Sequence, residues 1–283
     1  MKTTVTAERG FLVGHILSMA FGLAGILLVL PNTEFITHLT KFGQTALVWS
    51  MAGGGAAYIL LGTIAVSIYA YRVCGAWHWL GFMLPAIALS LGSELLGTST
   101  GFPFGHYHYL SGLGYKIAGL VPFTIPLSWF YLGFSAYLIA RVGLGTLTIP
   151  NWCKYLGAIA IGALLLTSWD FVLDPAMSQT NVPFWVWEQP GAFFGMPYQN
   201  FAGWLGTGIL FMSIATLIWS FKPVTISSNS LDLPLAIYLS NLAFATIMSL
   251  ASGIYTPVYL GLVLGILPAL LLYKSAKSAP EAS

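Results

Sequence analysis

The chain has 283 residues, of which 57% are hydrophobic and 6% are charged, and its mean hydropathy is +0.83. A soluble globular domain carries about 25% charged residues, so this composition excludes that class and indicates a polytopic membrane protein. The net charge of +2 comes from scattered Lys and Arg residues. They form no basic cluster, and we therefore expect no nucleic-acid partner.

Several apolar runs are long enough to cross about 30 Å of hydrocarbon. In chain order they are Phe11–Leu30, Thr45–Ala70, Trp77–Leu96, Val121–Ala140, Trp152–Leu173, Phe201–Phe221, Leu233–Leu250 and Thr256–Tyr273. The sequence thus predicts an all-α bundle of about eight transmembrane helices, in a single integral membrane domain over residues 1–283. The tail, residues 274–283, is rich in Ser, Ala, Pro and Lys, and we expect it to be disordered.

The basic residues predict the orientation of the chain. An even number of spans places both termini on one side, and cytoplasmic loops carry the excess of Lys and Arg. The terminal side would hold Lys2, Arg9, Arg72, Arg141, Lys154, Lys222, Lys274 and Lys277, and the other side only Lys41 and Lys116. This asymmetry predicts cytoplasmic termini, and it also supports the number of spans, because one missed helix would scramble it.

Two connections on the opposite side, residues 97–120 and 174–200, are long. Long loops inside a compact fold are usually functional. The second loop is dense in aromatic residues, among them Phe184, Trp185, Trp187, Phe193, Phe194 and Tyr198. We expect both loops to lie on the membrane face and to cap a cavity between helices. For the Trp residues, a belt at the membrane interface is the alternative.

Three acidic residues lie in apolar sequence, where a carboxyl group is a candidate functional residue by default. Glu94 is near the end of the third span, and Asp170 and Asp174 are near the end of the fifth. Because chain direction alternates, these two spans end on the same side, and the three acids are predicted to share one chamber. Asp170 and Asp174 fall on one helical face, and Pro175 predicts the end of their helix. Helix C-termini and apolar surroundings both favour the neutral carboxylic acid, which is a proton donor.

Other polar residues accompany the acids. His106 and His108 follow the third span in H-Y-H-Y, and we interpret them as interfacial hydrogen-bonding residues rather than metal ligands. Asn200, at the start of the sixth span, could orient water or an acid, or it could cap its helix. His15, early in the first span, is expected to belong to a packed polar network. We expect neither a metal site nor a cofactor.

Several reaction classes use buried acids. The five histidines are too few and too scattered for an iron-dependent membrane hydroxylase. A UbiA-like prenyltransferase could hold magnesium with D-F-V-L-D, but a second acidic motif and cations to clamp a diphosphate are missing. A proton-coupled transporter of an apolar substrate stays open. An acid-catalysed enzyme for an apolar substrate needs only a protonated carboxyl, a polar group that positions water, and aromatic rings that face a cation.

Three motifs, taken together, resemble the carotenoid hydratase family of the CruF type. They are S-E-L-L-G-T-S-T-G-F-P-F-G-H-Y-H-Y, S-W-D-F-V-L-D-P-A-M and F-F-G-M-P-Y-Q-N-F-A-G-W, in this order. The resemblance covers most of the chain. It implies an integral membrane hydro-lyase that adds water, without a cofactor, across the terminal C1′–C2′ double bond of a linear carotenoid such as γ-carotene or lycopene. The product is a tertiary alcohol, and the partners are the carotenoid, water and membrane lipid.

The roles of individual residues follow from the chemistry rather than from the family. Asp170 or Glu94 is the expected proton donor, and the other acid or Asp174 orients the water. His106 or His108 could return the proton. The substrate-binding candidates are Tyr107, Trp169, Trp187, Tyr198 and Asn200.

Overall fold

The computed structural model describes residues 2–180 and 182–278. In chain order the α-helices are α1 (Lys2–Ala24), α2 (Thr33–Thr37), α3 (Lys41–Thr100), α4 (Thr124–Gly145), α5 (Asn151–Met177), α6 (Tyr198–Ser220), α7 (Asp232–Ala251), α8 (Thr256–Leu260) and α9 (Leu267–Ser278). The other helical segments are η1 (Gly25–Val29), η2 (Ser228–Leu231) and η3 (Gly261–Ile266). The strands are β1 (Tyr107–Tyr109), β2 (Lys116–Ile117), β3 (Val121–Pro122) and β4 (Trp185–Trp187).

The all-α membrane architecture predicted from composition is confirmed. Within the described residues, seven helical segments are long and apolar enough to cross a membrane. One of them, α3, has 60 residues and contains both the second and the third predicted spans. At about 1.5 Å per residue, a straight helix of that length would be about three times as long as the hydrocarbon is thick.

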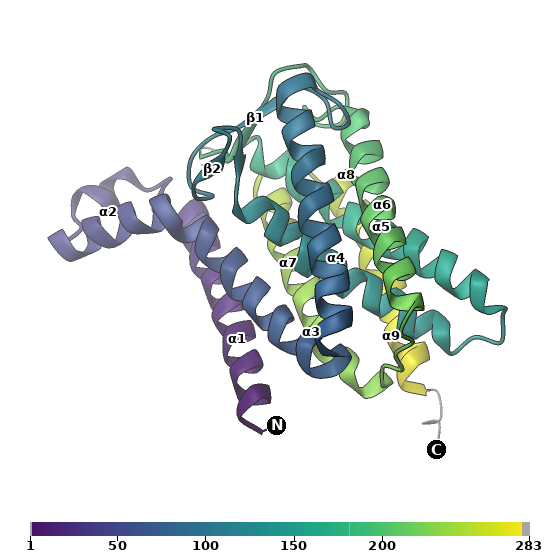
Figure 1. Ribbon diagram of the computed structural model, residues 1–283. Helices are drawn as coiled ribbons and strands as arrows, with labels where there is room; N and C mark the ends of the chain where they lie inside the picture. The colour runs from purple at the N-terminus through teal and green to yellow at the C-terminus, as the bar shows by residue number, and fades with distance from the viewer. Residues whose placement is uncertain (1, 181, 279–283) are drawn as a thin grey trace.

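A change of direction at Gly75 solves this mismatch. Its φ of 80° and ψ of 168° are not helical, and glycine adopts such angles without steric cost. The residue divides α3 into two arms that meet at the bottom of the view in Figure 1. We call residues 41–74 the first arm and residues 76–100 the second arm. With two arms in α3, the described residues contain eight helical segments that could cross a membrane, the number that the sequence predicts.

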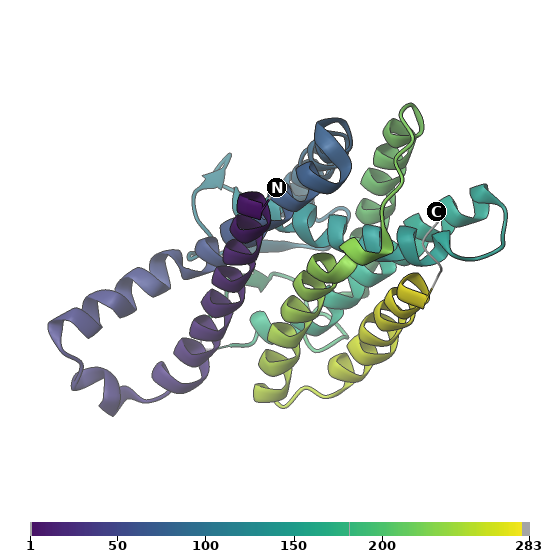
Figure 2. The same cartoon turned by 90° about the horizontal axis from the view of Figure 1, so that it is seen from below.

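The bundle is built around α4. In the most apolar part of this helix, 83% of the residues are buried inside the protein, compared with 11% for the segment that contains α1. Aromatic rings fill the space beside α4, and Phe82, Phe134 and Phe211 are fully buried there. In contrast, α1 and the first arm of α3 stand at the edge of the molecule, as Figure 2 shows.

The first helix is tied to the bundle by a buried polar network at His15. The Nδ1 atom of His15 lies 2.7 Å from the carbonyl oxygen of Tyr58, and its Nε2 atom lies 2.9 Å from Nδ2 of Asn241. The hydroxyl of Tyr131 donates to the side chain of Asn241. His15 is therefore the packed network residue expected from the sequence.

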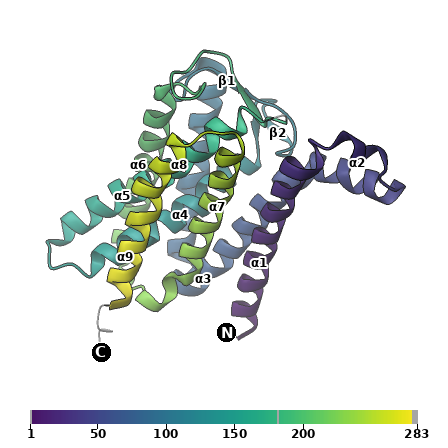
Figure 3. The same cartoon turned by 180° about the vertical axis from the view of Figure 1, so that it is seen from behind.

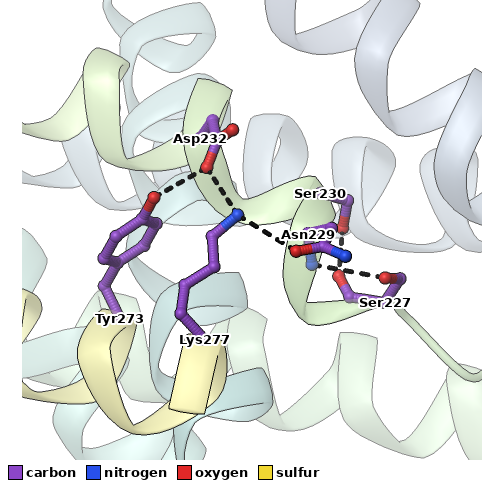
Figure 4. Close-up of polar contacts among 6 residues, drawn as sticks. All are labelled: Ser227, Asn229, Ser230, Asp232, Tyr273 and Lys277. Carbon is purple, nitrogen blue, oxygen red and sulfur yellow. Dashed lines mark hydrogen bonds and ion pairs between the residues drawn. The ribbon is translucent and has the colours of Figure 1, made fainter. Parts of the chain in front are cut away.

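The chain begins in α1 and leaves α9 at the same end of the bundle, as an even number of crossings requires (Figures 1 and 3). The expected disorder of the tail is wrong for residues 274–278, because α9 continues through Ser278. Figure 4 shows the reason: Lys277 forms an ion pair with Asp232 at 2.9 Å, and the Tyr273 hydroxyl donates to the same carboxylate at 2.8 Å. Residues 279–283 lie outside the described residues.

The two long loops meet at the other end of the bundle. Strands β1 and β4 pair in antiparallel fashion, with Tyr107 opposite Trp187 and Tyr109 opposite Trp185. We call these two strands and their flanking loops, residues 101–123, 178–180 and 182–197, the roof. The sequence predicts loops that cap a cavity between the helices, but it does not predict the β-ladder that joins the two loops.

Candidate active site

One cavity beneath the roof brings the three acids together. Glu94 reaches it from the second arm of α3, and Asp170 and Asp174 reach it from α5. All three side chains are buried, with relative exposures of 2%, 4% and 4%. The cavity has a volume of about 60 Å³, and since one water molecule needs about 10–15 Å³, it has room for a few of them.

Hydrogen-bond donors surround Glu94. Its Oε2 atom accepts from the hydroxyl of Tyr109 at 2.9 Å and from the hydroxyl of Tyr107, and its Oε1 atom accepts from the indole N–H of Trp129 at 3.0 Å. An ionised carboxylate is an acceptor only, whereas a neutral one must donate its own proton. Three donors directed at one carboxyl group therefore match its ionised form.

The two tyrosines are themselves held neutral. Burial and the neighbouring carboxyl of Glu94 raise the pKa of Tyr107 and of Tyr109 well above the ordinary value for a phenol. They lie on β1, whose side chains alternate between its two faces. This alternation turns Tyr107 and Tyr109 toward the cavity and makes them fixed donors to Glu94.

Fewer donors reach the two aspartates. Asp170 accepts a bond of 2.8 Å from the side-chain amide of Asn200. The Oδ2 atom of Asp174 has no hydrogen-bond partner among the described residues, and neither have the indole nitrogens of Trp185 and Trp187, although both tryptophans line the same cavity as Asp174. Buried polar groups of this kind around a space large enough for water are the usual partners of water molecules.

The helix that carries the aspartates is longer than expected. The predicted end at Pro175 is wrong, because α5 continues to Met177. A proline so close to the C-terminus removes a single backbone hydrogen bond, and the next turn is held by Ser178, whose N–H and hydroxyl both donate to the carbonyl of Asp174. The extra residues keep Asp174 inside the last helical turn and directed into the cavity.

Aromatic rings form much of the cavity wall. Trp129 and Trp204 stack with ring centroids 3.9 Å apart, and Trp169 meets Trp204 edge to face at 5.7 Å. Trp185 and Trp187 close the wall from the roof. Faces of such rings carry negative charge density and stabilise a nearby cation.

The structure brings only some of the predicted site residues to the cavity. Those that line it are Glu94, Asp170, Asp174, Tyr107, Trp169, Trp187 and Asn200. His108 is exposed on the opposite face of β1 and lies 2.8 Å from Glu188, and His106, the residue before the strand, is exposed as well. Tyr198 is 63% exposed. The same alternation that directs the two tyrosines inward directs His108 outward, and neither histidine meets the acids.

One residue of the site was missed altogether. Trp129, a direct partner of Glu94, lies in α4 within a continuous apolar run, and nothing in that run marks it as different from a core residue. Its indole N–H pairs with an acid that is 35 positions away in the chain. Only the packing of α4 against α3 reveals the contact.

The donor set around the cavity also bears on metal and phosphate binding. Among the described residues, no three His, Cys, Asp or Glu side chains are grouped so that they could hold a metal ion. No Lys or Arg is among the described residues that line the cavity. The site therefore offers carboxyl, hydroxyl, amide and indole groups in an apolar enclosure.

Comparisons with known proteins agree with the motifs. Residues 54–268 match the family model described as carotenoid biosynthesis protein. The chain is 38% identical over 142 residues to a bisanhydrobacterioruberin hydratase from Haloarcula japonica, a match that covers 50% of this chain and 45% of that protein. The match thus spans about half of the relative's length. No solved structure gives a significant match.

Proposed function

Because the chain belongs to the carotenoid biosynthesis protein family, we propose that it is a carotenoid hydratase, which adds water to the terminal C1′–C2′ double bond of a linear carotenoid such as γ-carotene or lycopene. The observation that carries the proposal is the cavity itself, in which three buried acids and unpaired polar groups share a water-sized space with an aromatic wall. The relative named as a hydratase supports the reaction class.

The reaction begins with a proton transfer to carbon. A carboxylic acid protonates the less substituted carbon of the double bond, and the positive charge develops on the carbon that bears two methyl groups. We assign the proton to the pair Asp170 and Asp174, because fewer donors reach these carboxyls than reach Glu94. Trp169, Trp204 and Trp129 line or back the space where the cation forms.

Water then captures the cation. The oxygen of water bonds to the tertiary carbon, and the proton that it loses passes to a carboxylate of the cavity. Glu94, with three donors that favour its ionised form, stabilises the cation by its charge. Asn200 orients Asp170. The proton gained from water replaces the one given to carbon, so the reaction needs no net supply of protons.

The alternatives fit the geometry less well. A prenyltransferase needs cations or bound magnesium around a diphosphate, and the described lining of the cavity has no Lys or Arg. A transporter needs a polar path through the bundle, whereas the core beside α4 is filled with aromatic rings such as Phe82 and Phe211.

Expression in a lycopene-producing host tests the proposal. Mass spectrometry of the extracted pigments should find products heavier than lycopene by one water, and growth in ¹⁸O-labelled water should place the label in the new hydroxyl. The matched control is the same host with the Asp170→Asn variant. A pigment profile that stays unchanged with several linear carotenoids, or a hydroxyl whose oxygen comes from O₂, would overturn the proposal.

A further inference from the structure

A second and much larger hollow lies beside the acid cavity. It has a volume of about 830 Å³ and runs between α1 with η1 on one side and the first arm of α3 on the other. Its described lining contains no charged residue. Ligand pockets commonly have volumes of about 300–1,000 Å³ and mostly apolar walls. We call this hollow the groove.

Glycines keep the groove open. Gly22 of α1 and Gly25 of η1 line one side of the groove, and Gly53 and Gly54 line it from the first arm of α3. A Cβ atom added at any of the four would meet no other atom within 4 Å. The space beside these positions is therefore unfilled by the protein, and side chains there would narrow the groove.

The groove and the acid cavity share part of their walls. Tyr58, Phe184 and Phe244 line both spaces. These three rings come from three elements, the first arm of α3, the roof and α7, and the rings of Tyr58 and Phe244 stack at 6.0 Å. The carbonyl of Phe184 accepts a bond of 2.7 Å from the N–H of Leu110, which fixes its backbone to the edge of the ladder.

The volumes of the acid cavity and the groove indicate that one substrate would occupy both spaces. The acid cavity, at about 60 Å³, holds a few water molecules or the end of a hydrocarbon chain. The rest of a carotenoid, a long, uncharged polyene with methyl branches, must lie elsewhere. The groove follows α1 and η1 from Leu17 to Leu30. The length of this stretch is about 20 Å at 1.5 Å per residue.

We propose that the groove binds the polyene chain of the substrate, and that Tyr58, Phe184 and Phe244 form the passage through which its terminal double bond reaches the acids. This inference rests on the proposed function, because the occupant is the carotenoid of that reaction. The substrate enters sideways, from the lipid between α1 and the first arm of α3. The groove then selects for long, straight and apolar chains, while the acid cavity selects for the chain end.

Bulkier side chains at the glycines test the proposal. In the double variant Gly22→Leu/Gly54→Leu, both side chains would occupy the groove, and helix propensity would rise rather than fall. We expect this purified double variant to bind lycopene at least about tenfold more weakly than the parent protein does, as measured by the visible absorbance of the retained pigment. Gly22→Ala/Gly54→Ala should give a smaller loss of binding, which provides a graded readout if the leucine variant accumulates poorly.

Two other glycines supply a matched control. Gly10 of α1 and Gly92 of α3 also have no atom within 4 Å of an added Cβ, but neither lines the groove or the acid cavity. Gly10→Leu/Gly92→Leu should bind lycopene like the parent. The proposal is overturned if the groove variant binds and hydrates lycopene as well as this control does.

The outcomes also separate the two proposals. If the parent binds lycopene, the groove variant does not, and no water is ever added, the groove is correct and the hydratase assignment fails. If the parent and the groove variant hydrate lycopene equally well, the hydratase assignment holds and the groove is not the binding site.

Discussion

In the proposed mechanism, Asp170 and Asp174 are the residues on which the chemistry depends most directly. Asn200 gives Asp170 one donor, and the Oδ2 atom of Asp174 has none within the described chain. The few donors around the aspartate pair therefore leave room for a neutral, protonated carboxyl at Asp170 or Asp174. The three donors around Glu94 favour a negatively charged carboxylate there.

Asp170→Asn should remove the transferable proton and little else. The carbonyl of the new amide can still accept the bond from Asn200, so membrane levels should stay normal. Loss of a general acid lowers the rate by about a hundredfold to ten-thousandfold, and hydration should fall by that amount in initial-rate assays. Asp174→Asn should show a smaller loss if Asp170 is the donor.

A histidine provides the control for these variants. The side chain of His108 is 50% exposed and outside the cavity, so His108→Gln should hydrate substrate at close to the parental rate. If Asp170→Asn and Asp174→Asn both accumulate normally and remain active while His108→Gln is inactive, the assignment of the acid is wrong.

At this scale the sequence predicts acids better than aromatic residues. Glu94, Asp170 and Asp174 are conspicuous because carboxyl groups are rare in apolar runs, and alternating chain direction is enough to bring them to one end of the bundle. Trp129 is not conspicuous, because a tryptophan in an apolar helix has the same pattern whether or not its N–H pairs with an acid. The direction of His106 and His108 could not be predicted without the strand that sets their alternation.

Among the elements, the ladder of β1 and β4 decides how the cavity is closed. Three-residue strands leave almost no periodic signal, and the ladder joins segments nearly 80 residues apart, so composition and spacing do not reveal it. The break of α3 at Gly75 is different, because the spans on either side of it follow from hydrophobic length alone. Loop contacts thus depend on tertiary packing, while helix boundaries depend on local sequence.

A disulfide across the ladder tests whether the roof must open. His108 lies directly opposite Val186, and such pairs have Cα atoms about 4.5–5.5 Å apart, within the range for a disulfide. In a background of Cys74→Ala and Cys153→Ser, we expect oxidised His108→Cys/Val186→Cys to keep more than half of its hydration activity, because the proposed route of the substrate runs through the groove and not through the roof.

The same protein after reduction is its own control. Equal rates before and after reduction, with the disulfide confirmed by mass spectrometry, would agree with a roof that stays closed. An oxidised form that is inactive and recovers on reduction would contradict entry of the substrate from the lipid through the groove. It would indicate instead that the substrate enters through the roof.

For the whole molecule, the basic residues predict which end faces the cytoplasm. The beginning of α1 and the end of α9 lie at the same end of the bundle, opposite the roof, and the predicted terminal side carries most of the Lys and Arg residues, including Arg72 and Lys277. The even number of crossings could be predicted from hydrophobic runs. The depth at which each acid lies depends on the packing of α3 and α5 and could be predicted only approximately.

Thiol labelling tests the orientation. In the same background of Cys74→Ala and Cys153→Ser, Ser111→Cys in the roof should react with a membrane-impermeant maleimide in intact cells. Lys274→Cys in α9 should react only after the membrane is permeabilised. Labelling of both positions from one side would contradict the orientation and the number of crossings.

The position of the acid cavity between the groove and the roof has a consequence for how the two reactants meet. A carotenoid dissolves in the bilayer and hardly at all in water, and water hardly dissolves in the bilayer. In the proposed arrangement, the groove opens toward the hydrocarbon, and the roof lies at the helix ends, next to the aqueous phase. In the proposed reaction, the acid cavity is therefore the place where two immiscible phases meet, and we expect the rate to depend on how carotenoid and water partition into the cavity as well as on the acids.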